Sequence, residues 1–237
     1  AHARRGSQRR IPPFHGFCRA ALDTEQWDRM ETDYMRLRSD CDQIVRQAIA
    51  AVQPDAAVRR ALSGRKLPPG RVILVAVGKA AWSMAYTAYS CIGARLSGGI
   101  VVTKYGYSHG PIGNLRIREA GHPVPDEESF SATEEALALT EGLSKDDLVL
   151  FLLSGGGSAL FEAPLVPQGE LQDITRQLLA CGADIVEINT IRKRLSAVKG
   201  GRFAKHCAPA SVLSIVLSDI LGDPLDMIAS GPTYPDS

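Results

Sequence analysis

Three short polar segments of the chain, residues 78–79, 154–158 and 218–223, each stand directly after an apolar run. In open α/β sheets, ligands bind at the carboxyl ends of the strands. If the apolar runs are strands, the three segments meet at one edge of the sheet. The sequence therefore indicates a ligand site built from these segments.

The segment that follows the fourth apolar run is the strongest single signal. It consists of Ser154, Gly155, Gly156, Gly157 and Ser158. Three glycines let the backbone turn sharply and bring N–H groups close to an anion, and a helix that starts after them adds its positive end. The pattern is neither a P-loop nor the G-x-G-x-x-G dinucleotide fingerprint. We expect phosphate or carboxylate binding here, with Ser158 as a hydroxyl donor; a tight turn without a ligand is the alternative.

Charged side chains in the other two segments suggest further roles. Lys79 follows Gly78 and could neutralise a phosphate as a point charge, although a solvated lysine at a strand end is the simpler reading. Asp219 and Asp223 could hold Mg²⁺ through carboxylate oxygens or accept the proton of a hydroxyl nucleophile. Asp223-Pro224 is also a turn signal, so a purely structural role stays open.

A basic stretch supplies more candidates for binding an anion. Asn189, Arg192 and Lys199 lie in or just after an expected helix over residues 184–198, which Gly200 and Gly201 follow. Helical spacing places Arg192 and Lys199 on one face and Asn189 on the neighbouring one. Such runs of bases are usually solvated, but an arginine among them can bind a carboxylate through two hydrogen bonds.

One further side chain is a candidate for lining this site. His122, between Gly121 and Pro123, is kept as a lining residue only, because a single loop histidine is more often structural than catalytic.

The elements that must position these residues follow from the periodicity. Strands are expected at 71–77, 99–103, 115–120, 148–153 and 211–217, and helices at 80–92, 126–142, 168–181 and 184–198. Apolar strands alternating with helices predict an α/β fold, a Rossmann-like three-layer sandwich with a mostly parallel sheet.

Two helices are expected ahead of the first strand. A capping-box spacing of Ser39 and Asp42 predicts a helix from Ser39 that Pro54 stops, and a second short helix follows over 55–62.

Composition excludes several classes of protein. Hydrophobic residues make up 45% and charged residues 22% of 237, which is typical of a globular chain, and no apolar run is long enough for a transmembrane helix. Residues 1–20 hold five of the 27 basic residues and no acidic one. The rest offers no basic face for nucleic acid. The five cysteines form no C-x-x-C pair, which predicts reduced, mostly buried thiols in a cytosolic protein.

Five stretches of the sequence, taken together, resemble the two-domain glycerate 2-kinase family, the type-2 or MOFRL-type glycerate kinases. The stretches are residues 77–81, 121–126, 153–160, 189–202 and 217–233, in the order the family has them. The resemblance covers about residues 36–235.

The resemblance implies ATP-dependent phosphorylation of D-glycerate at its 2-hydroxyl, with Mg²⁺. It makes Lys79 the counterpart of the family's active-site lysine and residues 154–158 that of its glycine loop. Asn189, Arg192 and Lys199 match residues that line the cleft, and Asp219 and Asp223 match loop acids, which are candidates for catalysis or for Mg²⁺.

Members of that family are about twice as long. We therefore expect residues 1–34 to be an Arg-rich extension, disordered or upstream of the true start, and residues 35–237 to be one domain. We expect a C-terminal domain, which this chain lacks, to complete the cleft, and this chain to be weakly active alone. Two alternatives are a hydroxypyruvate reductase and a non-catalytic domain that binds a nucleotide or sugar phosphate. The expected partners are small molecules, without nucleic acid or membrane, and a homodimer is left open.

Overall fold

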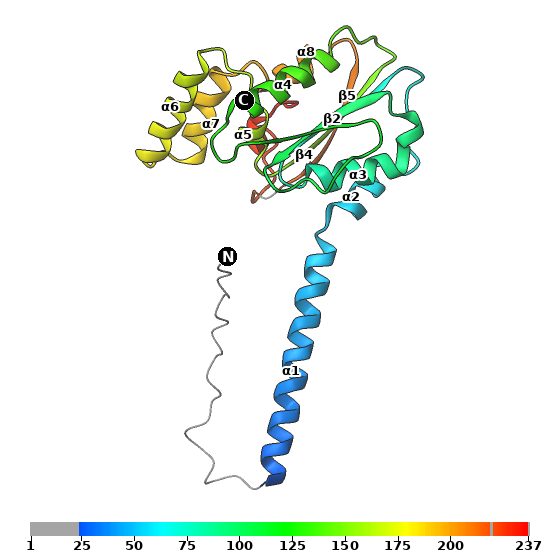
Figure 1. Ribbon diagram of the computed structural model, residues 1–237, viewed down its shortest axis with the longest axis vertical. Helices are drawn as coiled ribbons and strands as arrows, with labels where there is room; N and C mark the ends of the chain where they lie inside the picture. Colours follow the sequence, from blue (N-terminus) through cyan, green and yellow to red (C-terminus); the bar gives the residue numbers. More distant parts are fainter. Residues whose placement is uncertain (1–23, 219, 237) are drawn as a thin grey trace, which may run out of the picture. The chain divides into compact units, whose positions relative to one another are not determined.

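The computed structural model describes residues 24–218 and 220–236, and the chain divides into two compact units, residues 1–53 and 54–237 (Figure 1). The described part of the first unit is a 28-residue helix, α1 (Thr24–Ala51), with a turn after it. Within the described residues, no helix is both long and apolar enough to cross a membrane.

The predicted helix start at Ser39 is wrong, because α1 begins at Thr24. Residues 24–38 contain no glycine or proline and several strong helix formers, so the capping signal at Ser39 lies inside a longer helix. The domain boundary expected after residue 34 also falls inside α1.

The second unit is built on one five-stranded sheet, and the predicted α/β class is confirmed. The strands are β1 (Val72–Val77), β2 (Gly98–Lys104), β3 (Arg116–Ala120), β4 (Leu148–Ser154) and β5 (Ser211–Leu217). Their order is β3-β2-β1-β4-β5, and every pair is parallel. The direction of winding reverses between β1 and β4, which is where open α/β sheets bind ligands.

Helices cover both faces of the sheet (Figure 1). On one face, α2 (Pro54–Leu62) and α3 (Ala81–Ile92) pack against Leu74 and Leu150. On the other, α4 (Glu127–Leu139) and α8 (Arg202–His206) pack against Val75 and Phe151. Because β1 and β4 are buried on both faces, they are continuous apolar runs in the sequence.

The remaining helices connect these layers. They are η1 (Gly93–Arg95), α5 (Gly157–Leu160), α6 (Gln168–Ala180), α7 (Ile185–Arg194) and η2 (Ile228–Ser230). α6 and α7 follow each other as a helical pair at one end of the unit (Figure 1).

The last long helix is shorter than predicted. α7 begins at an Asp184 cap, as expected, but it ends at Arg194 rather than at 198. The guanidinium of Arg202 donates to the carbonyls of Lys193 and Ser196 and so closes the end of the helix. Lys199 therefore lies in the following turn, and the predicted helical face that it shares with Arg192 does not exist.

The cysteines also depart from expectation. Cys91 and Cys181 are exposed, Cys41 is exposed on α1, and only Cys207 is buried among the four that the structure describes. Cys18 lies outside the described residues. The prediction of mostly buried thiols is therefore wrong, although the four described cysteines are free thiols.

Candidate functional site

The segments after β1 and β4 lie against each other at the carboxyl edge of the sheet. The backbone N–H of Lys79 donates to the carbonyl of Gly155 at 2.9 Å, and that of Ala80 donates to Ser154 Oγ at 3.0 Å. Gly78 has a φ of 121°, and a Cβ there would lie 2.2 Å from Ser154 Oγ. Only glycine lets the two segments approach this closely.

The glycine loop, residues 154–158, turns at Gly156, whose φ is 88°. A Cβ on Gly156 would lie 3.0 Å from the His122 ring and 3.3 Å from Lys79 Cγ, so both side chains flank this glycine. α5, which follows the turn, is only four residues long. The positive helix end expected here is therefore that of a single turn, and the site has to draw its charge from side chains.

A cavity of about 240 Å³ opens beside the loop. The loop contributes Gly155, Gly156 and Ser158 to its wall, α7 contributes Asn189 and Arg192, and His122 closes one side. The segment after β5 adds apolar residues of η2. The structure thus brings His122, the glycine loop and α7 together, although these segments lie about 30 to 70 residues apart in the sequence.

A chain of hydroxyl groups ties the loop to α7. Ser230 Oγ donates to Asn189 Oδ1 at 2.8 Å and lies 3.2 Å from Ser158 Oγ. Because Ser230 uses its single proton on Asn189, the proton between the two serines comes from Ser158. Ser230 has a φ of 61° and is fully buried, a conformation that a serine rarely adopts and that is typical of functional sites.

Two buried cations bind the carbonyl of Ser158 at the end of the glycine loop. The Arg192 guanidinium donates to the carbonyl of Ser158 at 2.6 Å, and Lys199 Nζ donates to the same carbonyl at 3.0 Å. The Glu162 carboxylate lies 3.1 Å from Lys199 Nζ and 3.6 Å from Arg192 Nη2. Burial lowers the pKa of Lys199 to about 8, against the opposing effect of Glu162. Burial also lowers the pKa of Arg192.

Only part of this cluster faces the cavity. Arg192 lines it, and its buried Nε donates to no described residue. The ammonium of Lys199 is fully buried on carbonyl oxygens and Glu162, and Lys199 is not part of the cavity wall. Lys199 therefore binds the loop and Glu162, and its ammonium does not reach the cavity.

Of the two loop acids, only Asp223 lies within the described residues. Asp219 lies outside the described residues. Asp223 is exposed, with a φ of 49°, in the segment after β5 and is not part of the cavity wall. Within the described part of the chain, no three His, Cys, Asp or Glu side chains gather as a metal site would require.

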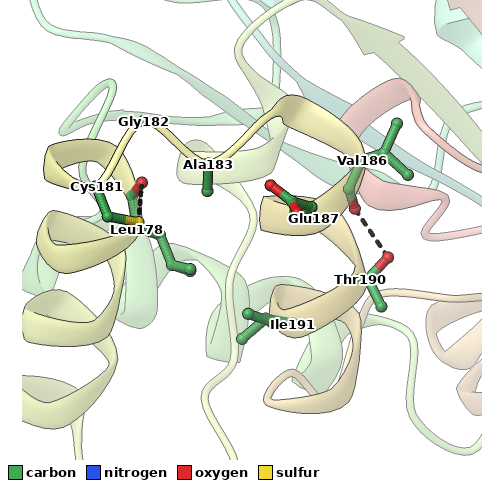
Figure 2. A pocket seen from close by; sticks show the side chains of 8 residues that line it. All are labelled: Leu178, Cys181, Gly182, Ala183, Val186, Glu187, Thr190 and Ile191. Carbon is green, nitrogen blue, oxygen red and sulfur yellow. Dashed lines mark hydrogen bonds between the residues drawn. The ribbon is translucent and has the colours of Figure 1, made fainter.

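A second hollow, of about 560 Å³, lies between the end of α6 and the start of α7 (Figure 2). Its polar groups are satisfied locally: Thr190 donates to the carbonyl of Val186, and Glu187 accepts from the backbone N–H of Asp184. No basic side chain lines it. Five of the residues predicted from sequence to bind an anion line the first cavity instead: Gly155, Gly156, Ser158, Asn189 and Arg192.

Sequence reasoning missed two residues of the site. Glu162 gave no signal, because it follows the glycine loop as a single acid in an apolar stretch. Ser230 lies inside the stretch 217–233 that carries the resemblance, but its left-handed backbone is not readable from the residue type.

Comparison with known proteins finds a matching family and several relatives of the chain. Residues 40–237 match a family described as a domain of unknown function, DUF4147. A D-glycerate 2-kinase of Thermotoga maritima is 58% identical over 197 residues, which cover 82% of this chain and 47% of that protein. A putative hydroxypyruvate reductase of Agrobacterium vitis is 41% identical and covers 88% of this chain and 47% of that protein.

The fold has a close counterpart of known structure. The crystal structure of a glycerate kinase from Thermotoga maritima superposes with a TM-score of 0.81 and 56% sequence identity, covering 86% of this chain and 49% of that one. The chain thus spans about half the length of the relatives that it matches.

Proposed function

The chain belongs to the glycerate kinase family, as its DUF4147 domain, and on that premise we propose that it forms the anion-binding part of a D-glycerate 2-kinase. The reaction is transfer of the γ-phosphoryl group of ATP to the 2-hydroxyl of D-glycerate, which gives 2-phosphoglycerate and ADP. The part of the relatives beyond the matched half supplies the opposite wall of the cleft. Because positioning is most of phosphoryl-transfer catalysis, this chain alone has weak activity.

The observation that carries the proposal is the convergence of Asn189, Arg192 and the glycine loop around one cavity at the switch point of the sheet, with Lys79 beside Gly156 of the loop. Both substrates are anions, one with a carboxylate and one with phosphates. A buried arginine whose Nε has no hydrogen-bond partner among the described residues, and an exposed lysine beside the glycine loop, are suited to binding such groups.

Each side chain has a role in the proposal. Lys79 and the backbone of the glycine loop hold phosphate or carboxylate oxygens. Asn189 and Arg192 orient the bound anion, with Asn189 fixed by Ser230. Lys199 holds the Ser158 carbonyl and so keeps the loop in place. Charge stabilisation by these preorganised groups lowers the barrier to transfer.

Asp219 and Asp223 are the residues that would hold Mg²⁺ or orient the attacking 2-hydroxyl. The Asp223 side chain is exposed and makes no hydrogen bond or ion pair with any described residue, so its oxygens are free, and carboxylate oxygens are the ligands that Mg²⁺ prefers. When bound, Mg²⁺ neutralises part of the phosphate charge. The chain itself contributes the carboxylate and a cationic cavity.

A second candidate is reduction of hydroxypyruvate, because one relative has that name. Reduction needs a nicotinamide cofactor. The sequence has no G-x-G-x-x-G fingerprint, and the glycine loop here leads into only four residues of helix. The kinase is therefore the better supported function.

Ligand-dependent thermal unfolding of this chain tests the proposal. D-glycerate and ATP with Mg²⁺ are each expected to raise the midpoint of unfolding, and the two together to release ADP slowly. If neither ligand raises the midpoint of unfolding and no ADP is released, the proposal is contradicted. Oxidation of NADH or NADPH by hydroxypyruvate, followed at 340 nm, would support the reductase instead.

A further inference from the structure

We propose that Glu162 is a positioning residue for the candidate site: it holds two buried cations against the glycine loop and so fixes the shape of the anion cavity. The proposal deepens the proposed function and rests on it for the identity of the anion. Glu162 does not line the cavity, so it acts through Arg192 and Lys199.

The first step of the argument is the position of the carboxylate. Glu162 is completely buried directly after α5, and its backbone N–H donates to Thr133 Oγ at 2.9 Å. Its Oε1 has no hydrogen-bond partner among the described residues, and its Oε2 lies 3.1 Å from Lys199 Nζ. Its contacts there are the ion pairs with Lys199 and Arg192, which come from a turn and a helix some 30 residues further along the chain.

The second step is what the two cations do. Lys199 Nζ donates to the carbonyls of Ser158 and Phe161, and Arg192 donates to that of Ser158. One carbonyl at the end of the glycine loop thus accepts from two charged donors. Bonds to charged donors are about twice as strong as neutral ones. These bonds fix the loop only while Lys199 stays protonated and both side chains stay in place.

The third step is charge. Two cations face one carboxylate in a buried space, so the cluster carries a net positive charge, which is costly without a counter-ion. An anion in the cavity beside Arg192 would supply the missing negative charge. Glu162 therefore has two effects: it favours the charged form of Lys199, and it leaves one positive charge of the cluster for the ligand.

The charged groups that act on Lys199 are Glu162, from the segment after α5, and Arg192, from α7. Removing Glu162 takes away the group that favours the charged lysine. The pKa of Lys199, already lowered by burial, then falls further, and the lysine loses its proton at a lower pH.

Hydrogen exchange of this chain without ligand tests the positioning directly. In Glu162→Gln the amides of residues 156–160 are expected to exchange at least about tenfold faster than in the unchanged chain. Asp147→Asn is the matched control, because it neutralises a buried carboxylate at the opposite end of β4. Unchanged exchange at 156–160 in Glu162→Gln, or equal acceleration there in both variants, would overturn the proposal.

The second test is the pH at which the affinity for D-glycerate falls. Loss of packing alone would not change this pH. Affinity in the unchanged chain is expected to fall as pH rises through about 8, and Glu162→Gln is expected to shift this fall down by about one pH unit. The same fall at the same pH in both proteins would overturn the role of Glu162. If the unchanged chain does not bind D-glycerate, the proposed function fails, while the exchange experiment still decides the positioning.

A double variant covers the case in which Glu162→Gln does not fold. Glu162→Gln with Lys199→Met removes one charge of each sign and keeps the net charge of the cluster. It is expected to fold, to retain fast exchange at 156–160 and to show no fall in affinity near pH 8. Slow exchange at 156–160 in this variant would show that the loop needs neither residue and would overturn the proposal.

Discussion

The ammonium of Lys199 lies 3.0 Å from the carbonyl oxygen of Ser158, so a fully buried cation that does not line the cavity holds the glycine loop. The loop that is expected to bind an anion is thus tied to a charged group that never reaches that anion. The geometry separates residues that face the ligand from residues that shape the site, and each group has its own consequences.

Lys79 is expected to contribute directly to catalysis. A suitable protein is a chimera in which residues 40–237 replace the matching half of the Thermotoga maritima D-glycerate 2-kinase. Lys79→Ala in this chimera should lower kcat/KM by about 100-fold or more, because the variant lacks the positive charge that stabilises the transferring or leaving phosphate group. Lys145→Ala, an exposed lysine just before β4, is the control and should be silent. A loss below tenfold would remove Lys79 from the catalytic residues.

Arg192 is expected to carry much of the anion affinity. Arg192→Met should weaken D-glycerate binding by this chain by about 100-fold, and Arg192→Lys by about tenfold, because lysine keeps the charge but not the planar set of donors. Arg194→Met removes an exposed arginine from the same helix and should leave binding unchanged. Calorimetric titration measures all three. Equal affinities for Arg192→Met and Arg194→Met would place the anion elsewhere.

The left-handed backbone of Ser230 is expected to affect the free energy of unfolding. Ser230→Ala removes the donor to Asn189 and should cost about 1–2 kcal/mol in urea unfolding. Ser230→Gly loses the same bond but relieves the left-handed backbone, which is worth about 1 kcal/mol. The glycine variant should therefore be the more stable of the two. The reverse order would argue against a left-handed Ser230.

Lys199 is expected to make stability rise with pH. Its pKa is about 8 in the folded chain and 10.5 in the unfolded chain, so between these values the unfolded chain binds the extra proton. The free energy of unfolding should increase by about 1 kcal/mol between pH 8 and 9. Lys199→Met should abolish this increase.

The window for that comparison ends at pH 9 for a physical reason. Burial raises the pKa of Cys207 to about 11, which lowers stability as pH rises above the usual value of 9.0. Urea unfolding at pH 7.5, 8, 8.5 and 9 in both proteins separates the two groups. The same slope in Lys199→Met would contradict the assignment.

The sheet could be predicted from the sequence because strands that are buried on both faces have continuous apolar sequences. β5 was predicted at its observed bounds, and β1, β2, β3 and β4 within one residue at each end. The meeting of residues 78–79 with the glycine loop followed from the rule that parallel strands end at a shared edge. Local helix signals were weaker, as the misplaced start at Ser39 shows.

The inner part of the site could not be predicted, because it depends on contacts between distant segments. Lys199 meets Glu162 only because α7 ends at Arg194 and the chain turns back under the loop. Arg202, which closes α7, gave no signal of that role in the sequence. The backbone at Ala229 and Ser230 is left-handed where Ala229 packs against Gly157 and the Ser230 carbonyl accepts from the N–H of Gly200, which are contacts between distant segments.

The most direct test of the account is ADP release by the chimera in the presence of ATP, Mg²⁺ and D-glycerate. The account predicts D-glycerate-dependent turnover that Lys79→Ala and Arg192→Met each reduce, and no oxidation of NADH with hydroxypyruvate. A chimera that unfolds cooperatively on heating, and so is folded, but releases no ADP on addition of D-glycerate would contradict the assignment of this chain to a D-glycerate 2-kinase.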